Sequence, residues 1–159
     1  MPFTLVLPDG FQYVGIGLIS TGWVLMGQVL LVGKHRKRSG IPYPRLYAEK
    51  SEQEASREAL IFNCAQRLQS SALGRGCHQN SLEALPLLLP AALVTALKYP
   101  LVSAVGLVAW SLSRIPYTIG YMSGDVDKRT SNGSAFGSIA KMALLLTGTY
   151  VAASMALDL

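Results

Sequence analysis

Long apolar stretches alternate with short polar segments along the chain. The first apolar stretch covers residues 11–32. Its few polar positions are Gln12, Ser20, Thr21 and Gln28. An α-helix needs roughly 20 mostly apolar residues to cross a bilayer, and this stretch is long enough. The basic run Lys34–Arg38 ends the stretch sharply.

Three more apolar stretches follow, at residues 79–97, 101–121 and 136–157. Pro86 and Pro90 interrupt the first of them, and membrane helices tolerate proline. The pattern therefore predicts an all-α membrane protein. In this prediction, one domain over residues 1–159 forms a bundle of four transmembrane helices.

Composition and charge agree with this prediction. Half of the residues are hydrophobic and only 14% are charged, whereas soluble domains have about 25% charged residues. The net charge is +5. An excess of basic residues is typical of proteins that bind nucleic acid, lipid headgroups or a small anionic ligand. The long apolar stretches argue against nucleic acid.

The basic residues also predict the orientation in the membrane. They are concentrated in the first connector, from Lys34 to Arg57, and the third connector carries Lys128 and Arg129. The second connector has Lys98 alone. Because cytosolic loops carry an excess of lysine and arginine, we expect the first and third connectors to be cytosolic and both termini to face the other side.

Arg114 is the first candidate for chemistry, because a charged residue inside a membrane span is costly and often functional. Tyr117 and Tyr121 follow at helical spacings of three and seven residues, which places all three on one face. The alternative interpretation is an interfacial aromatic belt with an arginine that reaches to the membrane surface.

Asn80 and Glu83 form a second candidate, three residues apart at the start of the second span. They could bind an ammonium group, or they could cap the helix. The basic clusters at the same membrane face could bind anions, or they could serve topology and lipid contacts. The two cysteines, Cys64 and Cys77, lack zinc-ligand spacing, and we expect no metal site.

Several arginines, an acid, an amide and two tyrosines are thus expected at one membrane depth. Glutathione carries two carboxylates, one ammonium and one thiol. Arginine binds carboxylates in bidentate fashion, and glutamate matches the ammonium. An arginine beside the sulfur would favour the thiolate, which is the nucleophile. Apolar second substrates would arrive through the lipid.

Further motifs give the chain a family resemblance. They are Lys34–Arg38 with Tyr43-Pro44 and Tyr47, Phe62-Asn63-Cys64 with Gln66-Arg67, His78 to Glu83, Arg114 with Tyr117, Gly120-Tyr121 through Gly124-Asp125 to Lys128-Arg129, and Gly137 to Ala140. With these motifs the chain resembles the MAPEG family, and closely its microsomal glutathione S-transferase 3 branch. The likeness covers residues 10–156.

The resemblance implies a homotrimer of four-helix subunits, with glutathione sites between neighbouring subunits and open to the cytosol. It implies that Arg129 activates the thiolate, with Lys128 as the alternative. The glutathione-binding residues that it implies are Arg36, Arg67, His78, Asn80, Glu83, Arg114, Tyr117 and Tyr121. It places the protein in the endoplasmic reticulum membrane, with the nuclear envelope and outer mitochondrial membrane as alternatives.

Similar proteins add glutathione to lipophilic electrophiles and reduce lipid hydroperoxides, and some conjugate the epoxide leukotriene A. The resemblance therefore predicts a membrane-bound glutathione transferase and peroxidase. One alternative is a non-enzymatic lipid-binding member similar to the five-lipoxygenase-activating protein. Another is a structural four-span protein or small channel, in which the charges serve topology alone.

The chain departs from the family pattern at an insert over residues 68–77. In the family, the arginine that matches Arg67 lies almost directly before the His-Gln-Asn block. On a continuous helix, the roughly nine extra residues would add ~900° of rotation and ~13.5 Å of rise. Either the insert loops out and Arg67 keeps its place, or Arg75 replaces it, or the insert is a gene-model error.

Overall fold

The computed structural model describes residues 6–66, 77–123 and 134–157, and within these ranges every regular element is a helix. The prediction of an all-α fold is thus confirmed for the described residues. The long helices are α1 (Gln12–Ser39), α4 (Cys77–Ala96), α5 (Pro100–Met122) and α7 (Ser134–Ala156), and the short ones are α2 (Lys50–Ala55) and α3 (Arg57–Gln66).

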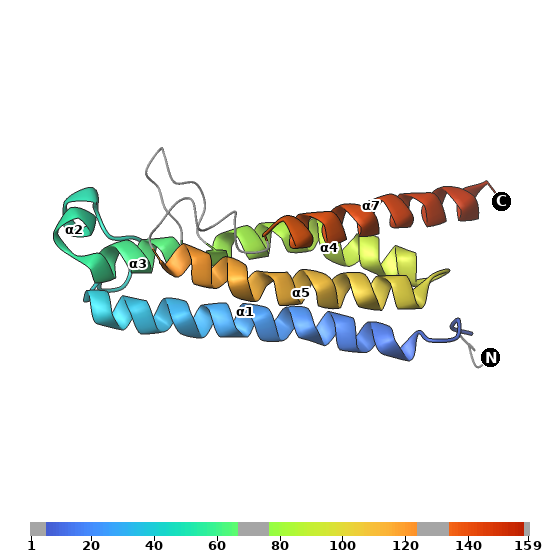
Figure 1. The fold of residues 1–159 in the computed structure, drawn as a ribbon, viewed down its shortest axis with the longest axis horizontal. Helices are drawn as coiled ribbons and strands as arrows, with labels where there is room; N and C mark the ends of the chain where they lie inside the picture. Colours follow the sequence, from blue (N-terminus) through green and yellow to red (C-terminus); the bar gives the residue numbers. More distant parts are fainter. Residues whose placement is uncertain (1–5, 67–76, 124–133, 158–159) are drawn as a thin grey trace.

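The four long helices lie side by side along the long axis of the molecule, and α2 and α3 cover one end (Figure 1). Helix α5 contacts the other three long helices. The end of α1, the start of α4 and the end of α5 all lie at the end that α2 and α3 cover (Figure 1). This arrangement gathers the predicted site residues of α4 and α5 at one end.

Local sequence explains where the helices begin and end. Helix α1 continues through the basic run that follows the apolar stretch, because lysine and arginine favour helix and their charges suit a helix C-terminus. It ends at Gly40, whose φ of 68° closes the helix in the left-handed conformation. Glu49 and Glu52 form a capping box before α2. Pro100 occupies the first turn of α5, where no amide donor is needed.

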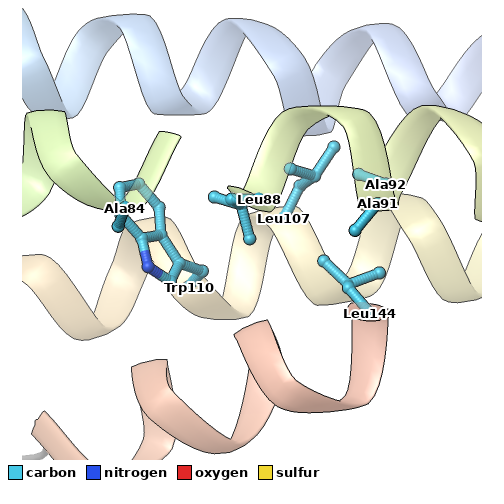
Figure 2. Close-up of a cluster of buried hydrophobic side chains, with 7 residues drawn as sticks. All are labelled: Ala84, Leu88, Ala91, Ala92, Leu107, Trp110 and Leu144. Atoms are coloured by element: carbon cyan, nitrogen blue, oxygen red, sulfur yellow. The ribbon is translucent and has the colours of Figure 1, made fainter. Parts of the chain in front are cut away.

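A cluster of small and large side chains forms the core between α4, α5 and α7. Figure 2 shows Trp110 and Leu107 of α5 against the alanines of α4, with Leu144 of α7 beside them. Gly106 permits this packing, because a Cβ there would lie 2.8 Å from Leu144. The helices therefore pack at close range, as small residues allow in membrane bundles.

Two of the described helices are long and apolar enough to cross a membrane, Gln12–Ser39 and Ala135–Ala156. Much of their apolar surface points outward, as at Trp23, Ile19 and Phe136. Such a surface suits contact with lipid. Helices α4 and α5 are not among them. Helix α4 begins with polar residues, and α5 contains Arg114 and several serines.

Part of the predicted site falls outside the described residues. Arg67, Arg75, Lys128, Arg129 and residues 68–76 of the predicted insert all lie there. Cys77, which ends the predicted insert, is the first residue of α4.

Candidate functional site

Arg114 is the centre of the site that the structure does describe. Its side chain is only 5% exposed. Its Nη1 donates a hydrogen bond of 2.9 Å to Oδ1 of Asn80. Its guanidinium also lies over the rings of Trp110 and Tyr117, at 4.8 and 4.7 Å from their centres. Arg114 is therefore a buried cation held by an amide and two aromatic faces.

The backbone around Arg114 is shaped to admit this large side chain. Gly137 of α7 faces it, and a Cβ at that position would lie 2.3 Å from Oγ of Ser113 and 3.3 Å from Nη2 of Arg114. On α5 itself, Thr118 donates a hydrogen bond of 2.7 Å to the carbonyl oxygen of Arg114. A glycine on α7 thus makes room for the arginine between the two helices.

Tyr117 and Tyr121 continue the same face of α5, as their spacing predicts. The hydroxyl of Tyr117 donates to that of Tyr121 at 3.1 Å, and the rings are 4.7 Å apart. Cys77 packs against both tyrosines, although the sequence indicated only an incidental thiol. Its thiol donates to the carbonyl oxygen of Ala65 at 3.5 Å and so joins the start of α4 to α3.

The three predicted residues on α4 point in different directions. The side-chain oxygen of Asn80 accepts a hydrogen bond from Arg114 on α5, so this oxygen does not cap the helix. Glu83 is exposed and accepts a hydrogen bond of 3.1 Å from Gln79. His78 is half-buried, and its Nδ1 has no hydrogen-bond partner among the described residues. Among the described residues, Asn80 is the one of these three that hydrogen-bonds to Arg114.

Arg36 belongs to a second group of contacts at the end of α1. Its guanidinium lies between the rings of Tyr43 and Phe62, at 4.3 and 4.7 Å from their centres. Its Nη1 donates to the carbonyl oxygen of Arg45 at 2.6 Å. These contacts attach the first connector to α1 and α3.

Asn63 and an ion pair fix the connector that holds Arg36. The side chain of Asn63 is buried and makes two hydrogen bonds of 2.9 Å to the backbone of Ala48. Arg45 makes two hydrogen bonds to the carboxylate of Glu52. These bonds lower the pKa of Glu52 below its usual value, and the hydrogen bond from the Glu49 amide adds to the effect.

The described part of the site therefore brings together Asn80, Arg114, Tyr117 and Tyr121. A buried guanidinium beside hydroxyl and amide groups can bind an anion. Sequence reasoning missed the roles of Trp110, Cys77 and Gly137, and Gly137 appeared only within a motif. Among the described residues, no group of three or more His, Cys, Asp or Glu side chains lies together.

Most of the chain also matches a known protein family. The family model for MAPEG matches residues 15–150, which include every residue of the site described above.

Proposed function

The chain belongs to the MAPEG family, and on this premise we propose that it is a membrane-bound glutathione transferase and glutathione-dependent peroxidase. Its substrates in this proposal are lipophilic electrophiles and lipid hydroperoxides. One observation carries the proposal: the buried guanidinium of Arg114, which Asn80 and Tyr117 hold in place. A fixed cation of this kind suits the carboxylates of glutathione.

The residues of the site fit parts of glutathione. Arg114 and Asn80 would bind a carboxylate, because guanidinium and amide groups both donate hydrogen bonds to it. The hydroxyls of Tyr117 and Tyr121 would complete the polar wall, and the exposed carboxylate of Glu83 would meet the ammonium. Arg36, Arg67 and His78 remain proposed binding residues. Bound glutathione would supply the nucleophile, its thiolate.

Arg129 is the residue that we propose for stabilising this thiolate, with Lys128 as the alternative. A guanidinium beside the sulfur favours the ionised form, because the opposite charge lowers the pKa of a thiol. In the transferase reaction, a carbon–sulfur bond forms and the electrophile's leaving group departs or its epoxide opens. In the peroxidase reaction, a hydroperoxide is reduced to an alcohol and water while two molecules of glutathione are oxidised to the disulfide.

The proposed assembly is a homotrimer of subunits with four spans each, in the endoplasmic reticulum membrane. The described helices support a cytosolic site, since the basic last turn of α1 lies at the same end of the bundle as the end of α5 (Figure 1). Arg36 supports a site between subunits, because its contacts are with Tyr43 and Phe62 and so lie in a group separate from Arg114. In the proposed trimer, the Arg36 side chain of a neighbouring subunit would leave these contacts to reach the site, because it is 8% exposed within its own subunit.

Thiolate absorbance at about 240 nm tests this proposal on the detergent-purified protein with glutathione at neutral pH. We expect a thiolate band that Arg129→Ala abolishes, since that arginine would stabilise the charge. Arg57→Ala removes an exposed arginine of α3 and should keep the band.

The same measurement can refute the proposal. If wild-type protein gives no band and binds no glutathione, the enzyme assignment is wrong. Binding of lipid by that protein would then favour the non-enzymatic member of the family. A band that Arg129→Ala retains would leave the enzyme in place but transfer the thiolate role to another cation.

A further inference from the structure

A proline interrupts α5 in the middle of the candidate site. Pro116 lies between Arg114 and Tyr117, inside the helix. Because proline has no amide hydrogen, the carbonyl oxygen of Leu112, four residues earlier, lacks its helical donor, and the proline ring crowds the same turn. Sharp bends in helices occur mostly at proline. The position of Arg114 relative to the two tyrosines of the site therefore depends on what holds α5 across Pro116.

A side-chain hydrogen bond spans this proline. The hydroxyl of Thr118, which follows Pro116, donates to the carbonyl oxygen of Arg114, which precedes it, at 2.7 Å. Threonine side chains compensate in this way for prolines in membrane helices. A threonine in a helix has two common rotamers, so the bond persists only if a neighbour keeps the hydroxyl directed at Arg114.

Gln28 of α1 is such a neighbour. Its Nε2 donates to Oγ1 of Thr118 at 2.9 Å, and both side chains are buried. Since the hydroxyl proton of Thr118 is used on Arg114, its oxygen can only accept, and Gln28 has to present its nitrogen. Successive hydrogen bonds strengthen each other in a low-dielectric interior. The chain of bonds therefore runs from α1, through Thr118, to the backbone of Arg114.

The place of this contact along the helices matters. A second side-chain hydrogen bond between α1 and α5 runs from Ser20 to Ser111 at 2.9 Å. Ser111 precedes Pro116, whereas Thr118 follows it. An attachment before the proline does not constrain the turns after it. The bond from Gln28 attaches α1 to the part of α5 that the proline would otherwise release.

We propose that Gln28 is a positioning residue of the candidate site: through Thr118 it holds α5 across Pro116. It thereby sets the guanidinium of Arg114 relative to the two tyrosines. Gln28 does not touch glutathione in this proposal, and its effect on glutathione binding rests on the proposed function.

Binding of glutathione to the full-length protein in detergent, measured by calorimetry, is the first test. Gln28→Leu keeps the size of the side chain without its amide and should weaken binding about fivefold. Thr118→Val, which keeps the shape without the hydroxyl, should weaken it by a similar factor. Thr118→Ser restores a hydroxyl and should recover most of that loss.

A double variant tests whether Gln28 acts through Thr118. If it does, Gln28→Leu combined with Thr118→Val should bind no more weakly than the weaker single variant, because both changes break one chain of bonds. Two independent effects would multiply to a loss of about 25-fold, and that result would overturn the proposal.

The side chain of Arg114 gives a second test that needs no glutathione. In protein with isotope-labelled arginine, the Nε–H signal of Arg114 is identified by its loss in Arg114→Lys. Because this Nε is buried, its hydrogen exchange should be slow in the wild type. Gln28→Leu and Thr118→Val should speed the exchange at least fivefold, since a looser helix exposes the group more often. If the wild type binds no glutathione, the proposed function fails, and this exchange still decides the role of Gln28.

Ser20→Ala is the matched control, because it removes a hydrogen bond of the same length between the same two helices. It should lower the unfolding temperature about as much as Gln28→Leu and leave glutathione affinity and Arg114 exchange unchanged. Equal effects of Ser20→Ala and Gln28→Leu on the exchange would overturn the proposal, because Gln28 would then only hold the helices together. If Gln28→Leu does not fold, equal exchange rates in Thr118→Val and Thr118→Ser would overturn it.

Discussion

The side-chain oxygen of Asn80 accepts a hydrogen bond of 2.9 Å from the guanidinium of Arg114 and so joins α4 to α5 inside the bundle. The bond fixes which way the arginine points, because a long side chain without it would lose its orientation. Asn80 thus affects the binding of an anion at this site in two ways. It can donate a hydrogen bond to the anion, and it holds the guanidinium of Arg114 in position.

Asn80→Ala should weaken glutathione binding about tenfold, which corresponds to ~1.4 kcal/mol for a hydrogen bond to a charged group. Titration calorimetry on the purified protein would measure it. Thr149→Ala, which removes a hydroxyl from the exposed side of α7, serves as the control. Unchanged affinity in Asn80→Ala would show that Arg114 needs no support from α4.

Gly137→Ala should lower stability by about 1–3 kcal/mol, the usual cost of an extra methyl group in a packed interior. The new Cβ would meet Oγ of Ser113 at 2.3 Å, so either the Ser113 side chain or α7 would have to shift. Thermal unfolding in detergent would measure the change.

The matched control for Gly137 is Gly22→Ala, because nothing lies within 4 Å of a Cβ there. This variant should unfold at or slightly above the wild-type temperature. Adding Ser113→Ala to Gly137→Ala should recover part of the loss, since it removes the closest atom. No recovery in the double variant would argue against this contact as the cause.

Asn63→Ala should destabilise the connector between α1 and α3 by about 1–3 kcal/mol, because it leaves the amide of Ala48 without its partner. The carbonyl oxygen of Ala48 loses one donor and keeps the side-chain amide of Gln53. Limited proteolysis should then cut between residues 40 and 56 sooner than in the wild type. Asn63→Asp keeps the acceptor and loses the donor, so its cleavage rate should be intermediate. Equal rates in all three proteins would contradict the role of Asn63.

The ion pair between Arg45 and Glu52 predicts a dependence on pH. Because the pKa of Glu52 is lowered from 4.5 in the folded protein, its stabilisation is fully present above about pH 4.5 and is lost as the pH falls through the lowered pKa. The protection of the α2 amides against hydrogen exchange, corrected for the intrinsic pH dependence of exchange, should therefore decrease below that pH. Glu52→Gln should show low protection at every pH. A wild-type protection that does not change with pH would refute the prediction.

Much of the arrangement at Arg114 could be predicted from the sequence. Helical spacing alone places Arg114, Tyr117 and Tyr121 on one face, and the structure has them there. The resemblance to MAPEG is confirmed by the family match, whereas the assignment to one branch stays a prediction. Hydropathy identified α1 and α7 as helices able to cross a membrane.

The remaining features depend on contacts between distant segments, which periodicity cannot supply. The sequence does not distinguish the contacts of Arg36 from those of the neighbouring basic residues. The fold of the connector shows that its guanidinium lies over the rings of Tyr43 and Phe62. No sequence pattern around Cys77 predicts that it is buried. Its burial results from the packing of α4 against Tyr117 and Tyr121 of α5. The hydrogen bond from Gln28 to Thr118 joins residues 90 positions apart.

Helix α1 has 28 residues and is therefore ~42 Å long, close to the ~40–45 Å of a bilayer with its headgroups. When its apolar part fills the hydrocarbon layer, its last two turns lie among the lipid phosphates and not in open water. The charges of Lys37 and Arg38 would then be neutralised by whichever lipids surround them. The length of α1 thus sets the distance between the first connector and the bilayer. In a thinner membrane, the connector would lie farther from the membrane surface.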